Sequence, residues 1–143
     1  MPLKFLSFRR VLVATALTCA ASLGLAGNVH AANLACKPDV KVTNNKPSAI
    51  KVLRFGYKDA SGAISMEGLD NKKLSKNETE EWKSQKLQDV AEGTVVSAIR
   101  VEYKNDTSGQ GSPSDPWSSA TWTIWYTQTG DCTNSRTYTV KVG

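Results

Sequence analysis

An alternation of apolar and polar side chains with a period of two residues is the feature that most constrains this chain. Successive side chains of a β-strand point to opposite faces of a sheet, so such an alternation predicts strands that are buried on one face. The clearest example is the segment 95–103, VVSAIRVEY. Its predicted core face consists of Val95, Ser97, Ile99, Val101 and Tyr103, and its other face of Val96, Ala98, Arg100 and Glu102.

Other segments repeat this pattern and are separated by turn-forming residues. The segment 50–59 alternates Leu53, Phe55 and Tyr57 with polar neighbours and places Ile50 and Val52 on the second face. The segments 39–43 and 138–143 put Val40 and Val42, and Tyr138, Val140 and Val142, on single faces. Short strands at this spacing predict an all-β domain, a single immunoglobulin- or fibronectin-like β-sandwich of about seven antiparallel strands.

The first 31 residues have the order of a secretory signal peptide. Three basic residues, Lys4, Arg9 and Arg10, precede an apolar run over 11–26, and small residues follow it. A run of about 16 residues is short against the roughly 20 that a membrane-spanning helix needs. We therefore expect a cleaved signal peptide over 1–31 and a β-sandwich domain over 32–143 that is periplasmic or secreted. An uncleaved anchor and a lipid-modified cysteine are the alternatives.

Removal of the leader changes the inventory of reactive groups. The sole histidine leaves with it, and fifteen of the 18 basic residues remain against all 13 acidic ones, a net charge of +2. This charge does not favour nucleic acid as a partner. Cys36 and Cys132 are then the one pair available in an oxidising compartment, so we expect a structural disulfide. Closing a loop of about 97 residues constrains the unfolded chain by about 4 to 5 kcal/mol.

The segment 74–94 is ambiguous between helix and strand. Ser75 and Glu78 have the spacing of a capping box, and the Glu, Lys and Gln content also favours a helix. Trp82, Leu87 and Val90, however, do not share one helical face. We therefore predict a strand over 80–85, followed by a corner that leads to the next strand.

Two resemblances follow from these segments. The corner at Leu87 and Val90, which enters the Gly93-Thr94 turn, resembles the corner before the next-to-last strands of fibronectin-type sandwiches. This resemblance implies architecture only. The chain as a whole is similar in general character to small exported proteins of Gram-negative bacteria, a similarity that implies no mechanism.

The segment 117–132, WSSATWTIWYTQTGDC, is the most aromatic part of the chain. The alternation sends Trp122, Ile124 and Tyr126 to the core, where large aromatic side chains normally fill the space between sheets. Trp125 falls on the opposite face among threonines. An indole in that position is either half-covered by a loop or an exposed contact residue.

The long loop over 105–116 is the other candidate binding element, because loops on a rigid scaffold often carry binding residues. Trp117 ends this loop, where it either anchors a ligand or packs on the sandwich edge. Asp106 and Asp115 lie in the loop. The candidate ligand-binding residues are therefore Trp125, Trp117, Asp106 and Asp115.

The mature chain offers little catalytic chemistry. Without histidine or a free thiol it has no Ser-His-Asp triad and no histidine-ligated zinc. The acidic residues over 67–89 alternate with lysines, which is typical of a solvated surface. Asp106, Asp115 and the serines near them do not match the spacing of a calcium loop. We therefore predict no catalytic residue, no cofactor and no metal site.

These observations predict a non-enzymatic exported protein that acts by binding a glycan or another protein. The alternative is a membrane-active protein whose aromatic and lysine side chains insert at a lipid interface. A hydrolase that uses paired carboxylates is a third hypothesis, less well supported because no acid–base pair stands out. The pattern does not indicate an oligomeric state.

Overall fold

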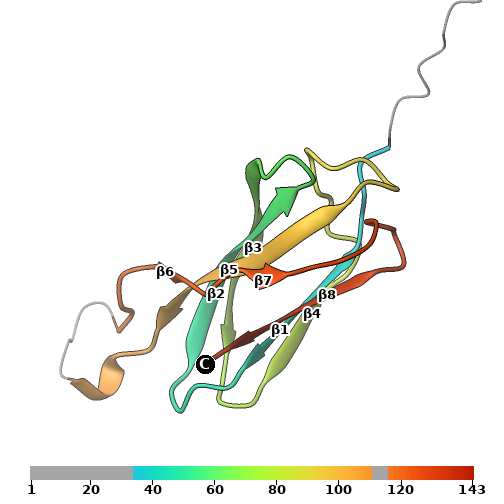
Figure 1. Ribbon diagram of the computed structural model, residues 1–143. Helices are drawn as coiled ribbons and strands as arrows, with labels where there is room; N and C mark the ends of the chain where they lie inside the picture. The colour runs from blue at the N-terminus through green and yellow to red at the C-terminus, as the bar shows by residue number, and fades with distance from the viewer. Residues whose placement is uncertain (1–33, 111–115) are drawn as a thin grey trace, which may run out of the picture. The chain divides into compact units, whose positions relative to one another are not determined.

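A computed structural model describes residues 34–110 and 116–143, so the predicted signal peptide over 1–31 lies outside the described residues. The described residues form strands, turns and one short 3-10 helix, η1 (Ser108–Gln110), and the strands build two sheets that pack face to face (Figure 1). The strands are β1 (Asp39–Asn44), β2 (Ile50–Asp59), β3 (Ile64–Leu74), β4 (Thr79–Trp82), β5 (Val96–Asn105), β6 (Thr121–Trp122), β7 (Tyr126–Thr127) and β8 (Thr137–Val142). The predicted all-β class is therefore confirmed.

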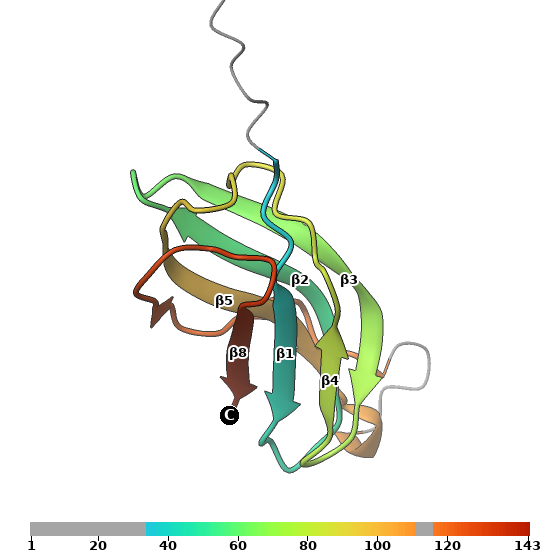
Figure 2. The ribbon, with the colours of Figure 1, turned by 90° about the vertical axis from the view of Figure 1, so that its right-hand side faces the viewer.

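The larger sheet has the order β3-β2-β5-β6, with β7 also paired to β5, and the smaller sheet has the order β4-β1-β8. The prediction that all strands are antiparallel is wrong at one pair, because β1 and β8 run parallel from Asp39↔Thr137 to Asn44↔Val142. Parallel neighbours need a long connection, and here the rest of the domain provides it. Figure 2 shows β8, β1 and β4 side by side in front of the larger sheet.

The hydrophobic core lies between the two sheets, and side chains from both of them fill it. The predicted core faces at the two ends of the domain are confirmed, since every member is fully buried. These residues are Val40, Val42, Tyr138, Val140 and Val142. From the larger sheet, Phe55 stacks against Tyr138 with ring centroids 6.1 Å apart. Burial of such apolar surface is the main stabilising contribution to folding.

A β-bulge in β2 changes the phase of the alternation. Against β5 the register shifts between Val52 and Arg54 so that Leu53 is an extra residue, whereas on the other side β3 carries the extra residues, because Val52 pairs with Lys72 and Arg54 with Gly68. A bulge of this kind moves the rest of the strand by one residue. Val52 and Phe55 are therefore both fully buried, and the prediction that Ile50 and Val52 lie on the opposite face from Phe55 is wrong.

A second bulge changes the phase of the alternation at the start of β5. Lys58 pairs with Ala98 and Asp59 with Val96, so that Ser97 is the extra residue. The Ser97 hydroxyl donates a hydrogen bond to the Asp59 carbonyl at 2.8 Å. Val96 is buried for this reason, whereas Val95, predicted to be in the core, is 36% exposed.

The sequence pattern does not predict β3, the edge strand of the larger sheet. Its apolar side chains are divided between faces: Leu69 is buried, whereas Ile64 and Met66 are exposed on the outer face. Glu67, a charged residue, occupies a buried position beside Leu69 and accepts a hydrogen bond from the Tyr57 hydroxyl at 3.0 Å. The apolar–polar alternation that identifies the other strands is therefore absent here.

The ambiguous segment forms a short strand and a corner. The predicted strand over 80–85 is observed as β4, which ends at Trp82. The capping-box pair closes the turn between β3 and β4 instead of a helix, since the Ser75 N–H donates to the Glu78 carboxylate at 2.6 Å. Leu87 and Val90 are buried, as a corner of this kind requires.

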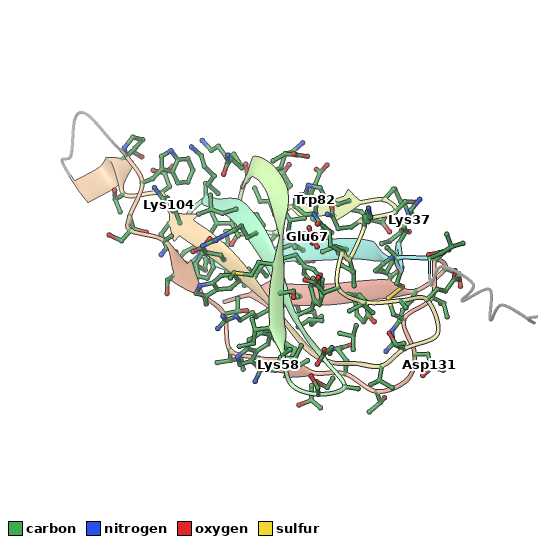
Figure 3. All side chains as sticks on the ribbon, turned by 90° about the horizontal axis from the view of Figure 1, so that it is seen from above. Lys37, Lys58, Glu67, Trp82, Lys104 and Asp131 are labelled. Carbon is green, nitrogen blue, oxygen red and sulfur yellow. A yellow bond between two sulfur atoms is a disulfide. The ribbon has the colours of Figure 1, made fainter. Side chains whose placement is uncertain are left out.

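The predicted disulfide joins Cys36 to Cys132, with 6.1 Å between the Cα atoms. Both residues are fully buried, and the bridge ties the segment before β1 to the segment before β8. Figure 3 shows the sulfur atoms at the end of the domain where Lys37 is labelled. A disulfide is consistent with an oxidising, exported location.

Among the residues that the structure describes, none belongs to a helix with the length and apolar character needed to cross a membrane.

Candidate functional site

The outer face of the larger sheet, which points away from the core, gathers cationic side chains from three neighbouring strands. The register of β3, β2 and β5 determines which side chains are neighbours across the strands. Lys58 lies between Ile64 and Ala98, and Gly56 lies between Met66 and Arg100. We call this surface the cation face. It is defined by Lys51, Arg54, Lys58, Lys73, Arg100 and Lys104, and in Figure 3 Lys58 and Lys104 are labelled at its two ends.

Two tryptophans organise one half of the cation face. The guanidinium carbon of Arg100 lies 4.1 Å from the ring centroids of both Trp122 and Trp125. Arg54 lies 5.5 Å from the Trp122 centroid, and Lys58 lies 4.5 Å from that of Trp125. Each indole therefore contacts two cations, an arrangement that the negative face of an aromatic ring stabilises.

Gly56 makes room for this arrangement at the centre of the sheet. A Cβ atom at this position would lie 3.0 Å from Cζ3 of Trp122 and 3.3 Å from Cγ of Arg100. The indole and the arginine stem thus rest directly on the backbone of β2. Any larger residue at Gly56 would push both groups away from their present positions.

Arg100 and Arg54 differ in whether a carboxylate of the protein forms an ion pair with them. Arg54 makes a bidentate ion pair with Glu102, with distances of 2.5 and 2.8 Å. This pair holds the pKa of Glu102 below its usual range. The Arg100 side chain makes no hydrogen bond and no ion pair within the described part of the chain, and its Nε atom is buried there without a hydrogen-bond partner.

The geometry of Arg100 suits the recognition of an anion. A guanidinium that stacks on aromatic rings uses its π faces for the contact and keeps its N–H donors in the plane. Such donors match the geometry of carboxylate, sulfate and phosphate groups. The two indoles also limit the freedom of the side chain, so less entropy is lost when an anion binds.

The predicted residues of the long loop meet at the other half of the cation face. Trp117 forms an isolated bridge with Asp106, and its ring centroid lies 4.5 Å from Lys51 and 5.9 Å from Lys73. The Ser108 N–H donates to the Asp106 carboxylate at 2.9 Å and lowers the pKa of that group. Asp115 lies outside the described residues.

The described residues contain no cluster of acidic, histidine or cysteine side chains that could hold a metal ion.

The aromatic segment departs from its predicted alternation. Thr123 pairs with Val101 through its backbone N–H at 2.9 Å and accepts a bond from the Val101 N–H on its hydroxyl at 3.1 Å. The ladder breaks between β6 and β7 at this point. Of the three residues predicted to be in the core, only Tyr126 packs against it.

The prediction is therefore wrong for Trp122 and Ile124. Trp122 pairs with Glu102 and lies on the cation face beside Arg100, whereas Ile124 is 76% exposed. Trp125 is half-buried, which matches the half-covered alternative, but the groups in contact with it are cations. Sequence analysis missed the cation face itself. The one signal for it was the position of Arg100 on the non-core face of 95–103.

Comparison with known proteins gives little support for a family. No family model matches the chain, and no curated protein matches it. A solved structure titled "Trapped Toxin" is similar at 13% identity over 73% of this chain, with a TM-score of 0.32. The chain spans about a fifth of that protein, as the match covers 21% of its length. A likeness this low carries no argument about fold or function.

Proposed function

We propose that this chain is an exported, non-enzymatic protein that binds an acidic glycan on its cation face, with an immunoglobulin- or fibronectin-like sandwich as the scaffold. The leader-like sequence of the first 31 residues and the buried disulfide support an exported, periplasmic or secreted location. The two packed sheets support the sandwich assignment.

The observation that carries this proposal is the placement of Arg100. Its guanidinium stacks 4.1 Å from two indole centroids, and no carboxylate of the described residues forms an ion pair with it. By contrast, Arg54 on the same face is neutralised by Glu102. A positioned cation that makes no ion pair inside the protein is suited to an anionic group of a ligand.

A glycan is favoured over a protein ligand because aromatic and cationic groups alternate on this face. Trp122 and Trp125 are half-buried, so part of each indole is still accessible beside Arg100. The apolar C–H faces of a sugar can pack on that aromatic surface while its acidic group binds the guanidinium. The Arg100 and Lys58 cations that contact Trp125 add positive charge beside that aromatic surface.

Replacement of Arg100 by alanine is expected to weaken the binding of acidic oligosaccharides by about 10- to 100-fold, because a hydrogen bond to a charged group contributes about 1.5–3 kcal/mol. Arg100→Lys keeps the charge but loses the planar fork, so we expect an intermediate affinity. Isothermal titration with heparin-derived and galacturonate tetrasaccharides measures the effect.

The controls for this experiment separate charge from position. Maltotetraose, a neutral oligosaccharide, should not bind, and Lys41→Ala on the opposite sheet should leave the affinity for the acidic probes unchanged, with thermal unfolding confirming that each variant is folded. A folded Arg100→Ala variant with unchanged affinity would contradict the proposal. So would the absence of binding to both acidic probes.

A second candidate function is binding to an anionic membrane surface. Ile64 and Met66 are 50% and 45% exposed on the outer face, next to Lys58 and Gly56 in the pairing register. Exposed apolar side chains beside cations are typical of surfaces that bind lipid interfaces. Flotation with phosphatidylglycerol vesicles that is lost in Ile64→Asp/Met66→Asp would favour this function. Failure to float with either anionic or phosphatidylcholine vesicles would exclude it.

A further inference from the structure

A row of three lysines crosses the cation face on neighbouring strands. Lys51 of β2 pairs directly with Lys73 of β3 on one side and with Lys104 of β5 on the other. Like charges directly opposite each other in a sheet are destabilising. We call these three residues the lysine row.

Little inside the protein compensates the charge of the lysine row. Within the described residues, none of the three lysines has a carboxylate within ion-pair distance. Two nearby carboxylates attract the lysines only beyond ion-pair distance, Glu102 acting on Lys104 and Asp106 on Lys73. Their direct contacts are with other groups, since Arg54 binds Glu102 and the Ser108 N–H donates to Asp106. The ring of Trp117 contacts two of the lysines but adds no negative charge. A row of like charges without a carboxylate in direct contact is a costly arrangement of the kind expected where a site is used for function.

The lysine row and Arg100 lie at different positions along the direction of strand β5. Lys104 follows Arg100 by four residues on the same face of β5, a distance of about 13 Å at roughly 3.3 Å per residue. The Arg54–Glu102 ion pair, which is nearly neutral as a unit, lies in the rows between them. The cation face therefore offers two separate positions for negative charge.

We propose that Arg100 and the lysine row are two subsites for one linear polyanionic glycan, in which acidic groups repeat along the chain. This inference rests on the proposed function and narrows it, because a glycan with a single terminal acidic group cannot occupy both positions. An extended chain that reaches both subsites binds the second one as an intramolecular step. Affinity should therefore depend on chain length.

The test is the affinity of the purified protein for heparin oligosaccharides of increasing length, from the disaccharide to the dodecasaccharide. We expect a rise on the order of a hundredfold once the chain spans both subsites. The triple variant Lys51→Ala/Lys73→Ala/Lys104→Ala should lose this rise but keep the affinity for the disaccharide. Its slope of log affinity against log salt should become shallower by about one for each lysine that binds an acidic group of the glycan.

A matched variant separates position from total charge. Lys41→Ala/Lys86→Ala/Lys141→Ala removes the same charge from exposed residues outside the cation face, and we expect it to bind the long chains as the unmodified protein does. Equal losses in the two triple variants would overturn the inference. So would an affinity independent of chain length, or equal affinity for single-stranded DNA with the same number of charges.

The outcomes distinguish this inference from the function on which it rests. If short oligosaccharides bind through Arg100 but length and the lysine row have no effect, the two-subsite inference fails and the acidic-glycan proposal stands. If no heparin or galacturonate oligosaccharide binds, both fail.

Discussion

Replacement of both Cys36 and Cys132 by alanine is expected to lower the free energy of unfolding by about 4 to 5 kcal/mol. The two cysteines are 96 residues apart in sequence, so the bridge restricts nearly the whole domain in the unfolded state. A loss of this size approaches the total stability of many small domains. We therefore expect much of the variant to be unfolded at 37 °C. Urea unfolding followed by tryptophan fluorescence measures the loss.

Reduction provides the matched control for this prediction. Addition of dithiothreitol should destabilise the unmodified protein by a similar amount and leave the alanine variant unaffected. If the variant and the oxidised protein unfold at the same urea concentration, the bridge has no structural role. Residual structure in the unfolded chain would reduce the effect without abolishing it.

Asn44→Asp is expected to be nearly as damaging, although the two side chains have almost the same shape. Asn44 is fully buried, and its amide nitrogen donates to the carbonyls of Ser48, Leu74 and Ser75 at 2.9, 3.2 and 3.1 Å. Its amide oxygen accepts the Lys46 N–H at 2.9 Å. Aspartate would place a carboxylate oxygen against three carbonyl oxygens. A buried charge without a partner costs about 3–5 kcal/mol.

The pH dependence of this variant distinguishes electrostatics from packing. Because the folded state disfavours the charged form, the pKa of the new aspartate should be raised above its unfolded value of about 3.9. The destabilisation should then be complete above the folded pKa and decrease as the pH falls through it. Asn45→Asp, an exposed neighbour with the same change of charge, should alter stability by less than about 0.5 kcal/mol. A loss that does not change with pH would contradict this explanation.

Much of the fold could be predicted because the relevant signals are local. The alternations over 39–43 and 138–143 identify their buried residues correctly, since no bulge interrupts those strands. The disulfide followed from the absence of a third cysteine after the predicted signal peptide. The errors in β2 and β5 have one cause, because a single bulged residue reverses the faces of all that follow it. Nothing in the apolar pattern marks Leu53 or Ser97 as the residue that bulges.

The candidate site was predicted only in part, because its residues come together through strand order. Trp117, Trp125 and Asp106 were identified from their residue types and their place in or near the loop. Arg100 could be placed on a non-core face but not beside two indoles. That contact depends on the break between β6 and β7, which brings Trp122 and Trp125 to the same face.

Local sequence is enough to establish that this chain forms strands, that one face of most of them is apolar, and that two cysteines can pair. These properties depend on neighbouring residues and on composition, so they can be read along the chain. The three-dimensional arrangement was needed to establish which strands pair, that the last one runs parallel to the first, and that Lys73, Lys51 and Lys104 stand in one row. Pairing between strands depends on contacts between residues far apart in sequence, and the period of two does not encode them.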